Sequence, residues 1–152
     1  MAINLHDDLP LLRDMTRRSL TDLLGRLLHL HKMLLEMERR AYERMYGRVT
    51  AGELLKLVMH HQQFAWLRAL SGIAVSIEEF LDDKDTAVEV EAQRLLMRVR
   101  SLLVPVETGS GFARRYYLAL QDDPDVVLAH RAVRDVLTAA EADSLRESGG
   151  IH

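Results

Sequence analysis

The sequence predicts an all-α protein, an up-down-up-down helical bundle of four main elements, the last of them kinked into two helices. Apolar residues recur at a spacing of three and four along most of the chain, which is typical of amphipathic helices. Alternation of apolar and polar residues long enough for a strand is absent. Short connections between the helical segments favour antiparallel packing of consecutive helices, and this predicts the bundle.

Interruptions in the helical pattern set the expected helix bounds. Gly47, the acidic run at 82–85 and the segment 105–111 are typical of turns. Between Asp123, which can cap a helix, and Pro124, which suits a first helical position, the last element should bend. We therefore expect helices at about 19–46, 50–81, 86–104, 111–121 and 124–138.

Three Ser/Thr-x-x-acid signatures support the starts of the first three helices, because such pairs satisfy the free amide groups of a helix start. They are Ser19 with Asp22, Thr50 with Glu53, and Thr86 with Glu89. The predicted organisation is an N-terminal segment at 1–18, a bundle domain at 19–138 and a loose C-terminal tail at 139–152. A short helix from Pro10 is left open.

Composition limits the class of protein. A chain of 152 residues with 48% hydrophobic and 28% charged residues fits one globular domain. The absence of cysteine excludes disulfides, thiolate metal sites and cysteine nucleophiles. We expect no cofactor.

Charge and hydropathy bear on partners and location. The net charge of −3 argues against nucleic acid as a partner. Asp7 and Asp8 stand where a signal peptide would carry positive charge, and no stretch approaches the roughly 18 apolar residues of a membrane span. The sequence predicts a cytoplasmic protein without a membrane partner.

The helix expected at 50–81 is unusually apolar in its middle. Between Phe64 and Ile77 the only charged side chain is Arg68, so this helix needs burial on more than one side. Small residues recur there at helical spacing. Since symmetric homodimers are the commonest oligomers, we predict a homodimer, with packing inside the monomer as the alternative. The interface candidates are Ala65, Trp66, Ala69, Gly72, Ile73 and Ser76.

Inward polar residues raise a second hypothesis. A heptad on the first long helix places Leu20, Leu27, Leu34 and Ala41 on one seam and Leu24, His31, Glu38 and Met45 on the other. On the next helix, His61 also faces apolar neighbours. His31, Glu38 and His61 are therefore the candidate metal ligands.

The spacing of these residues speaks against a metal centre. No glutamate has a histidine three residues later, which is the pattern of paired ligands in di-metal helical bundles. We favour a hydrogen-bonded pair of Glu38 and His61 that fixes the register of the two helices. On this interpretation the chain holds no metal.

Two stretches resemble a group of small uncharacterised helical proteins from proteobacteria. They are FAWLRALS at 64–71, running into IEEFLD at 77–82, and GFARRY at 111–116, leading to DPDVVLAH at 123–130. The similarity extends from about residue 20 to 137. It implies a bacterial single-domain protein and brings no activity, cofactor or site residues.

No complete catalytic motif is present in the sequence, so an enzyme is the less favoured class. The predicted function is a non-enzymatic protein-interaction or regulatory module. The alternative is a sensor that binds a metal or small ligand through its inward histidine and glutamate residues.

Overall fold

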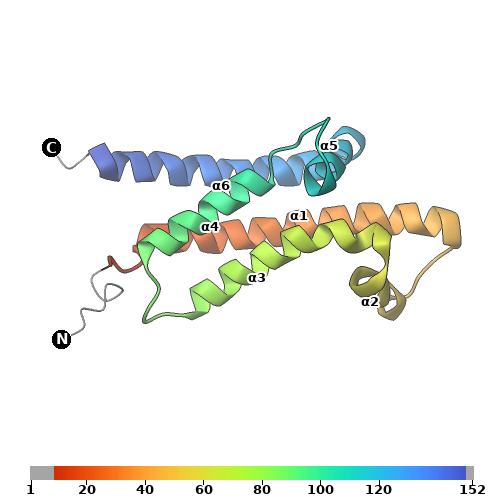
Figure 1. Ribbon diagram of the computed structural model, residues 1–152, viewed down its shortest axis with the longest axis horizontal. Coiled ribbons are helices and arrows are strands. Elements are labelled where there is room, and N and C mark those ends of the chain that lie inside the picture. The colour runs from red at the N-terminus through yellow and green to blue at the C-terminus, as the bar shows by residue number, and fades with distance from the viewer. Residues whose placement is uncertain (1–8, 150–152) are drawn as a thin grey trace.

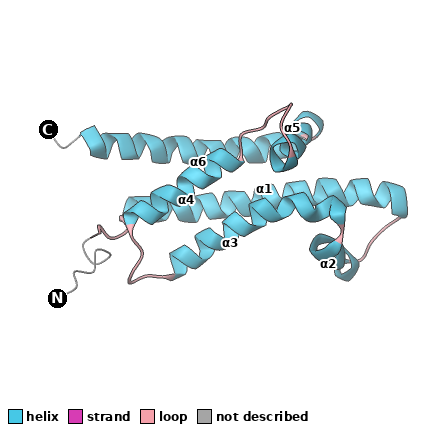
Figure 2. Cartoon of the chain, in the orientation of Figure 1, coloured by secondary structure: helices cyan, strands magenta, loops and turns pink. Residues whose placement is uncertain are grey.

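The computed structural model describes residues 9–149, which form six α-helices and one 3₁₀ helix and contain no strand (Figures 1 and 2). The all-α class is confirmed. The predicted bundle of four main elements is not, because the described chain has six helices. The elements are α1 (Asp14–Tyr46), α2 (Ala51–His60), η1 (Gln62–Leu67), α3 (Arg68–Asp82), α4 (Glu89–Leu102), α5 (Gly111–Asp122) and α6 (Pro124–Gly149).

The longest helix, α1, forms the centre of the fold and packs against both α6 and α3, while α4 packs mainly on α3. In Figure 1, α1 and α4 run in one direction along the molecule, and α3 and α6 return in the other. Helices α2 and α5 are short and lie at the same end as the C-terminus of α1.

The core stripe of α1 follows helical spacing. Its fully buried leucines are Leu20, Leu23, Leu27, Leu30 and Leu34. The predicted seam of Leu20, Leu27 and Leu34 is thus confirmed, whereas Met45 of the other predicted seam is 76% exposed. Because α1 is contacted by helices on two sides, its buried stripe runs through Leu23 and Leu30.

A single helix at 50–81 is the main error of the sequence-based prediction. The chain leaves the helical conformation at His61, whose φ of −86° and ψ of 135° are extended, and continues as η1 and α3. The ring nitrogen Nδ1 of His61 accepts a hydrogen bond from the backbone N–H of Gln63 at 3.1 Å. His61 thus caps the new turn that follows it.

One of the three predicted caps is confirmed. Thr50 caps α2, with its Oγ1 accepting from the N–H of Glu53 at 3.2 Å. Ser19 lies inside α1, which begins at Asp14, and Thr86 precedes the cap of α4 at Val88. The chain before α1 is antiparallel to the chain before α4, with a backbone bridge between Leu11 and Val88. Because of this pairing, α1 begins before its cap signature at Ser19 and α4 begins after the signature residue Thr86.

The predicted break at Asp123 is confirmed. Helix α5 ends at Asp122 and α6 begins at Pro124. The carboxylate of Asp123 is buried, and its Oδ1 accepts from the N–H of Asp125 at 2.9 Å. Asp123 therefore caps α6 where proline suits the first helical position.

The expectation of a loose tail from 139 is wrong for residues 139–149, which continue α6 to Gly149. Ala140 is buried, and Arg13 forms ion pairs with both Glu147 on α6 and Glu89 on α4. These contacts hold the end of the helix against the rest of the fold. Within the segment expected at 1–18, the helix begins at Asp14, and the remaining parts of both terminal predictions, 1–8 and 150–152, lie outside the described residues.

Among residues 9–149, no helix has both the length and the apolar character that crossing a membrane requires.

Candidate functional site

Glu38, one of the predicted site residues, is the most buried carboxyl group of the described chain, with 6% of its surface exposed. Its Oε2 accepts a hydrogen bond from Nε2 of Gln63 at 2.8 Å, and its Oε1 accepts from Nε1 of Trp66 at 3.1 Å. The same amide nitrogen of Gln63 also contacts the backbone carbonyl oxygen of Glu38. Both carboxylate oxygens are therefore used within the protein.

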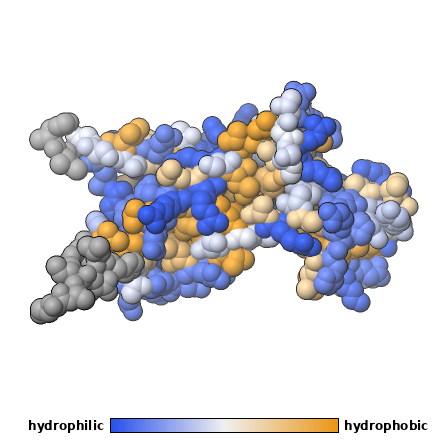
Figure 3. Space-filling model, in the orientation of Figure 1, coloured by the Kyte–Doolittle hydropathy of each residue, from blue (hydrophilic) through white to orange (hydrophobic). Residues whose placement is uncertain are grey.

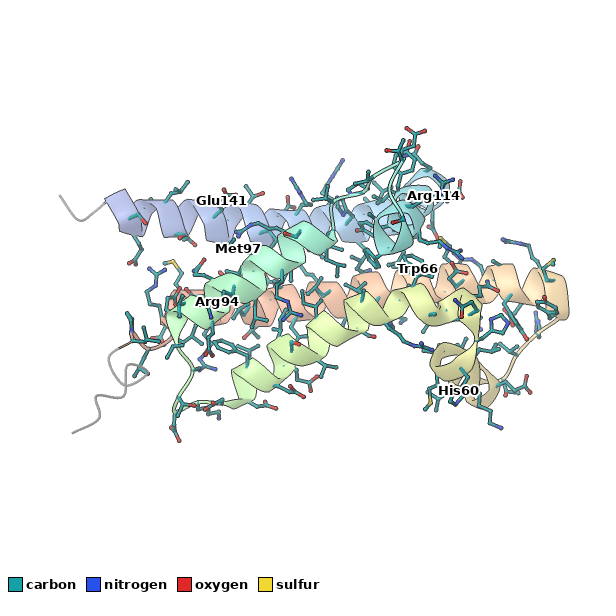
Figure 4. The ribbon with its side chains drawn as sticks, in the orientation of Figure 1. His60, Trp66, Arg94, Met97, Arg114 and Glu141 are labelled. Carbon is teal, nitrogen blue, oxygen red and sulfur yellow. The ribbon has the colours of Figure 1, made fainter. Side chains whose placement is uncertain are left out.

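The break at His61 makes this cluster. It turns the chain so that Gln63 and Trp66, both on η1, reach α1. The indole of Trp66 also packs against the ring of Phe112 on α5, with 5.3 Å between centroids, and Figure 4 shows Trp66 between α5 and the layer of α1 and α3. One side chain of η1 thus joins three elements.

The predicted hydrogen-bonded pair of Glu38 and His61 is wrong. The partners of Glu38 are Gln63 and Trp66, and the imidazole of His61 packs edge-on against the ring of Tyr42 at a centroid distance of 5.5 Å. The sequence placed His61 on a continuous helix, and the extended backbone there turns its side chain elsewhere.

The three candidate metal ligands are not brought together. No group of three His, Cys, Asp or Glu residues with a geometry for holding a metal occurs within the described range 9–149. His31 is half-buried on α1, and burial lowers the pKa of its imidazole below the ordinary value of 6.5. A neutral histidine in such surroundings is typical of a structural side chain.

A second buried polar pair links α5 and α6. The hydroxyl of Tyr116, which is fully buried, lies 2.6 Å from Nδ1 of His130. Burial raises the pKa of Tyr116 well above its ordinary value, and burial together with the nearby charge of Arg134 lowers the pKa of His130. Both groups are thereby held in their neutral forms.

A broad surface depression, the α3–α4 groove, lies between α3 and α4 and has a volume of about 820 Å³. Ala69 and Ile73 of α3 form one side. The other side is supplied by α4, chiefly through Arg94, Met97 and Arg98. Figure 3 shows hydrophobic side chains gathered over this part of the surface, and Figure 4 places Arg94 and Met97 along α4.

A smaller hollow of about 270 Å³ continues the groove along the same two helices and shares Arg94 and Arg98 with it. Ser76 and Phe80 line its α3 side. Met97, with 62% of its surface exposed, gives the groove an exposed apolar side. The apolar depression therefore extends over most of α3.

The six interface candidates divide between two environments. Ala69, Ile73 and Ser76 line the groove or its extension, and Gly72 is exposed between them with nothing within 4 Å of the place of a β-carbon. Ala65 and Trp66 belong to η1 instead, and Trp66 is used inside the fold by Glu38 and Phe112.

Sequence reasoning missed the α4 side of the groove. The available signal was Met97 outside the packed stripe of its helix, which is formed by Ala92, Leu96 and Val99. A single exposed methionine is common on protein surfaces, so it becomes informative only when α3 is known to lie beside it.

Comparison with known proteins adds no further constraint, since no protein-family model, curated protein or solved structure matches this chain.

Proposed function

We propose that this protein is a non-enzymatic interaction module that forms a homodimer, and that two copies meet through the α3–α4 groove. The observation that carries the proposal is a largely apolar depression of about 820 Å³ on the outside of the fold. Contiguous apolar surface of this kind is typical of interaction sites on soluble proteins.

The composition of the groove supports protein as the occupant. Met97 and two arginines stand beside small side chains, including Ala69 and Ser101. Methionine and arginine are enriched in the centres of protein interfaces, and small residues let another helix approach closely. A shallow groove between two helices can also bind a helix of the partner along its length.

Charge favours a second copy of the same chain. Arg94 and Arg98 form no ion pair with any described residue, and neither do Glu78 and Glu79 on the exposed part of α3. A two-fold interface uses the same surface twice, so α3 of one copy can face α4 of the other. The acidic residues of one protomer would then neutralise the arginines of its partner.

The wider setting of the proposal follows from the sequence. We infer a cytoplasmic location from the cysteine-free composition. The resemblance to small proteobacterial helical proteins agrees with a bacterial single-domain regulator. We assign no catalytic residue to the chain, and its action would depend on what the dimer contacts.

Paired substitutions test this function. Ala69→Glu and Met97→Glu each place a carboxylate in the groove, and both positions are exposed, so the fold tolerates them. Ala139→Glu and Met45→Glu make the same changes at exposed positions away from the groove. Sedimentation velocity at micromolar concentration compares all four with the wild type, with circular dichroism as the check on folding.

We expect the groove variants to sediment as monomers and both controls to remain dimers. A desolvated carboxylate in an interface without a partner weakens association strongly. A wild-type monomer, or dimers that persist in both groove variants, would overturn the proposal.

A further inference from the structure

A second concavity shares no lining residue with the α3–α4 groove. This hollow, the α1–α5 pocket, has a volume of about 610 Å³ and lies between the C-terminal half of α1 and the junction of α5 with α6. Its size falls in the range of small-molecule sites, roughly 300–1,000 Å³. The dimer proposal does not use it, and of the site residues predicted from the sequence only Glu38 lines it.

Three guanidinium groups line the pocket from two helices. Arg40 and Arg44 stand one turn apart on α1, and Arg115 projects from α5. Arg40 is fixed by an ion pair from its Nη2 to Oδ2 of Asp123 at 2.9 Å, and Asp123 is itself held as the cap of α6. Arg44 and Arg115 form no ion pair with a described residue.

Most carboxylate oxygens of the lining already accept hydrogen bonds from protein groups. Both oxygens of Glu38 accept hydrogen bonds from Gln63 and Trp66, and both oxygens of Asp123 are occupied. Asp122 is exposed at the rim and makes no ion pair within the described chain. The lining carries three arginines and three carboxylates, so its formal charges balance. Among the described residues, Arg44 and Arg115 keep unpaired N–H donors while only Asp122 of the lining keeps an unpaired carboxylate, and this surplus of donors favours an oxyanion as the ligand.

Apolar side chains complete the lining. Met37 on α1 and Leu118 on α5 face the same hollow, with Pro124 at the start of α6. A pocket with a few charged groups and an apolar wall binds molecules that have one charged end and a short hydrophobic body. Inorganic ions alone would leave this wall unused.

We propose that the α1–α5 pocket binds a small molecule with an oxyanion head group, a phosphate or a carboxylate, and a short apolar body. Arg44 and Arg115 bind the head group from opposite walls, because the planar guanidinium matches the oxygens of these anions. Arg40 lines the α1 wall and remains paired with Asp123. Met37 and Leu118 contact the apolar body.

The pocket has a built-in reporter. Trp66 is the only tryptophan of the chain, and it donates its indole N–H to Glu38, which lines the pocket. A ligand that contacts this wall should alter the surroundings of Glu38 and therefore the emission of Trp66. Trp66 does not line the α3–α4 groove, through which the dimer is proposed to form.

The test is a titration of the full chain with hexyl phosphate, followed by calorimetry and by Trp66 emission. Hexanoate, hexylammonium and inorganic phosphate are titrated in parallel. Arg44→Gln and Arg115→Gln remove one head-group contact each, and Arg131→Gln on the exposed face of α6 is the matched control.

We expect saturable binding of hexyl phosphate or hexanoate, and the tighter of the two identifies the head group. Either pocket variant should weaken binding about tenfold, which corresponds to roughly 1.4 kcal/mol for one charge-assisted contact. Arg131→Gln should leave the affinity unchanged. Inorganic phosphate should bind more weakly than hexyl phosphate, because it lacks the apolar body.

Several results would overturn the proposal. They are an absence of saturation by either anion at millimolar concentration, tighter binding of hexylammonium than of both anions, binding of inorganic phosphate as tight as hexyl phosphate, or an equal loss of affinity in Arg131→Gln. All of them can be read whether the protein is a monomer or a dimer.

Discussion

Glu38 and His130 are the residues at which burial and hydrogen bonding act most directly on stability. Glu38 is buried and His130 is partly buried, and each is hydrogen-bonded to an aromatic side chain, Trp66 or Tyr116. A polar group in the interior stabilises the fold only while its partners are present. Substitutions at these positions therefore report on the fold in a predictable direction.

Replacement of Glu38 by alanine should lower the free energy of unfolding by about 2 kcal/mol, because the buried donors of Gln63 and Trp66 lose their acceptor. The emission of Trp66 should shift as well. Glu36→Ala is the matched control, since Glu36 pairs with Arg39 at the surface and its loss should cost clearly less stability than Glu38→Ala. Urea denaturation measures both, and equal losses would contradict the role given to Glu38.

The His130 imidazole should make the protein less stable in mild acid. Burial and the charge of Arg134 hold its pKa below the ordinary value of 6.5, so the folded state disfavours the protonated ring. Stability is complete above about pH 6.5 and falls as the pH drops through the lowered pKa, since the unfolded chain binds the proton more tightly. Burial of His31 acts in the same direction.

His130→Gln should therefore reduce the loss of stability between about pH 7 and pH 5 without abolishing it. Urea midpoints at both pH values measure the effect. His29→Gln removes an exposed histidine of α1 and serves as the control. An unchanged pH dependence in His130→Gln would show that protonation of His130 is not coupled to unfolding.

At the scale of the helices, the sequence predicted those elements whose ends are determined locally. The start of α2 at Thr50 and the break before Pro124 depend on side chains that cap their own helix, and both predictions are confirmed. The starts of α1 and α4 depend instead on the pairing of Leu11 with Val88, far apart in the chain. Local spacing carries no information about such a contact.

The break at His61 was missed for a related reason. An apolar helical pattern continues through residues 54–77, and no glycine or proline interrupts it at His61. What favours the break is the set of contacts that η1 makes with α1, above all those from Gln63 and Trp66 to Glu38. These contacts exist only in the folded chain.

The end of α6 depends on one arginine. Arg13 pairs with Glu89 and Glu147, so Arg13→Ala should release the last turns of α6 from the rest of the fold. Hydrogen exchange should show faster amide exchange over 139–149 in this variant. Arg146→Ala, which removes an exposed pair with Asp143 inside the same helix, is the control. Equal exchange in both variants would contradict the anchoring role of Arg13.

For the molecule as a whole, composition and periodicity were sufficient to predict the helical class, but the sites depend on which helices become neighbours. The sequence showed the small residues Ala69, Gly72 and Ser76 at helical spacing. It did not show that Met97 of α4 lies on the other side of the same groove. The candidate ligands His31, Glu38 and His61 shared an apolar setting in the sequence without sharing a site in the fold.

Partner and ligand would use separate surfaces of the molecule. The α3–α4 groove would be covered by the second protomer, while the α1–α5 pocket would remain open to a small anion. The dimer is the central claim, because the function proposed for the chain depends on it.

The most direct test is the mass of the wild-type protein in solution, measured by sedimentation equilibrium over a range of micromolar concentrations. We predict twice the chain mass of 17.4 kDa, with dissociation at high salt if Arg94 and Arg98 pair with acidic residues of the partner. A particle of 17.4 kDa at every concentration would contradict it.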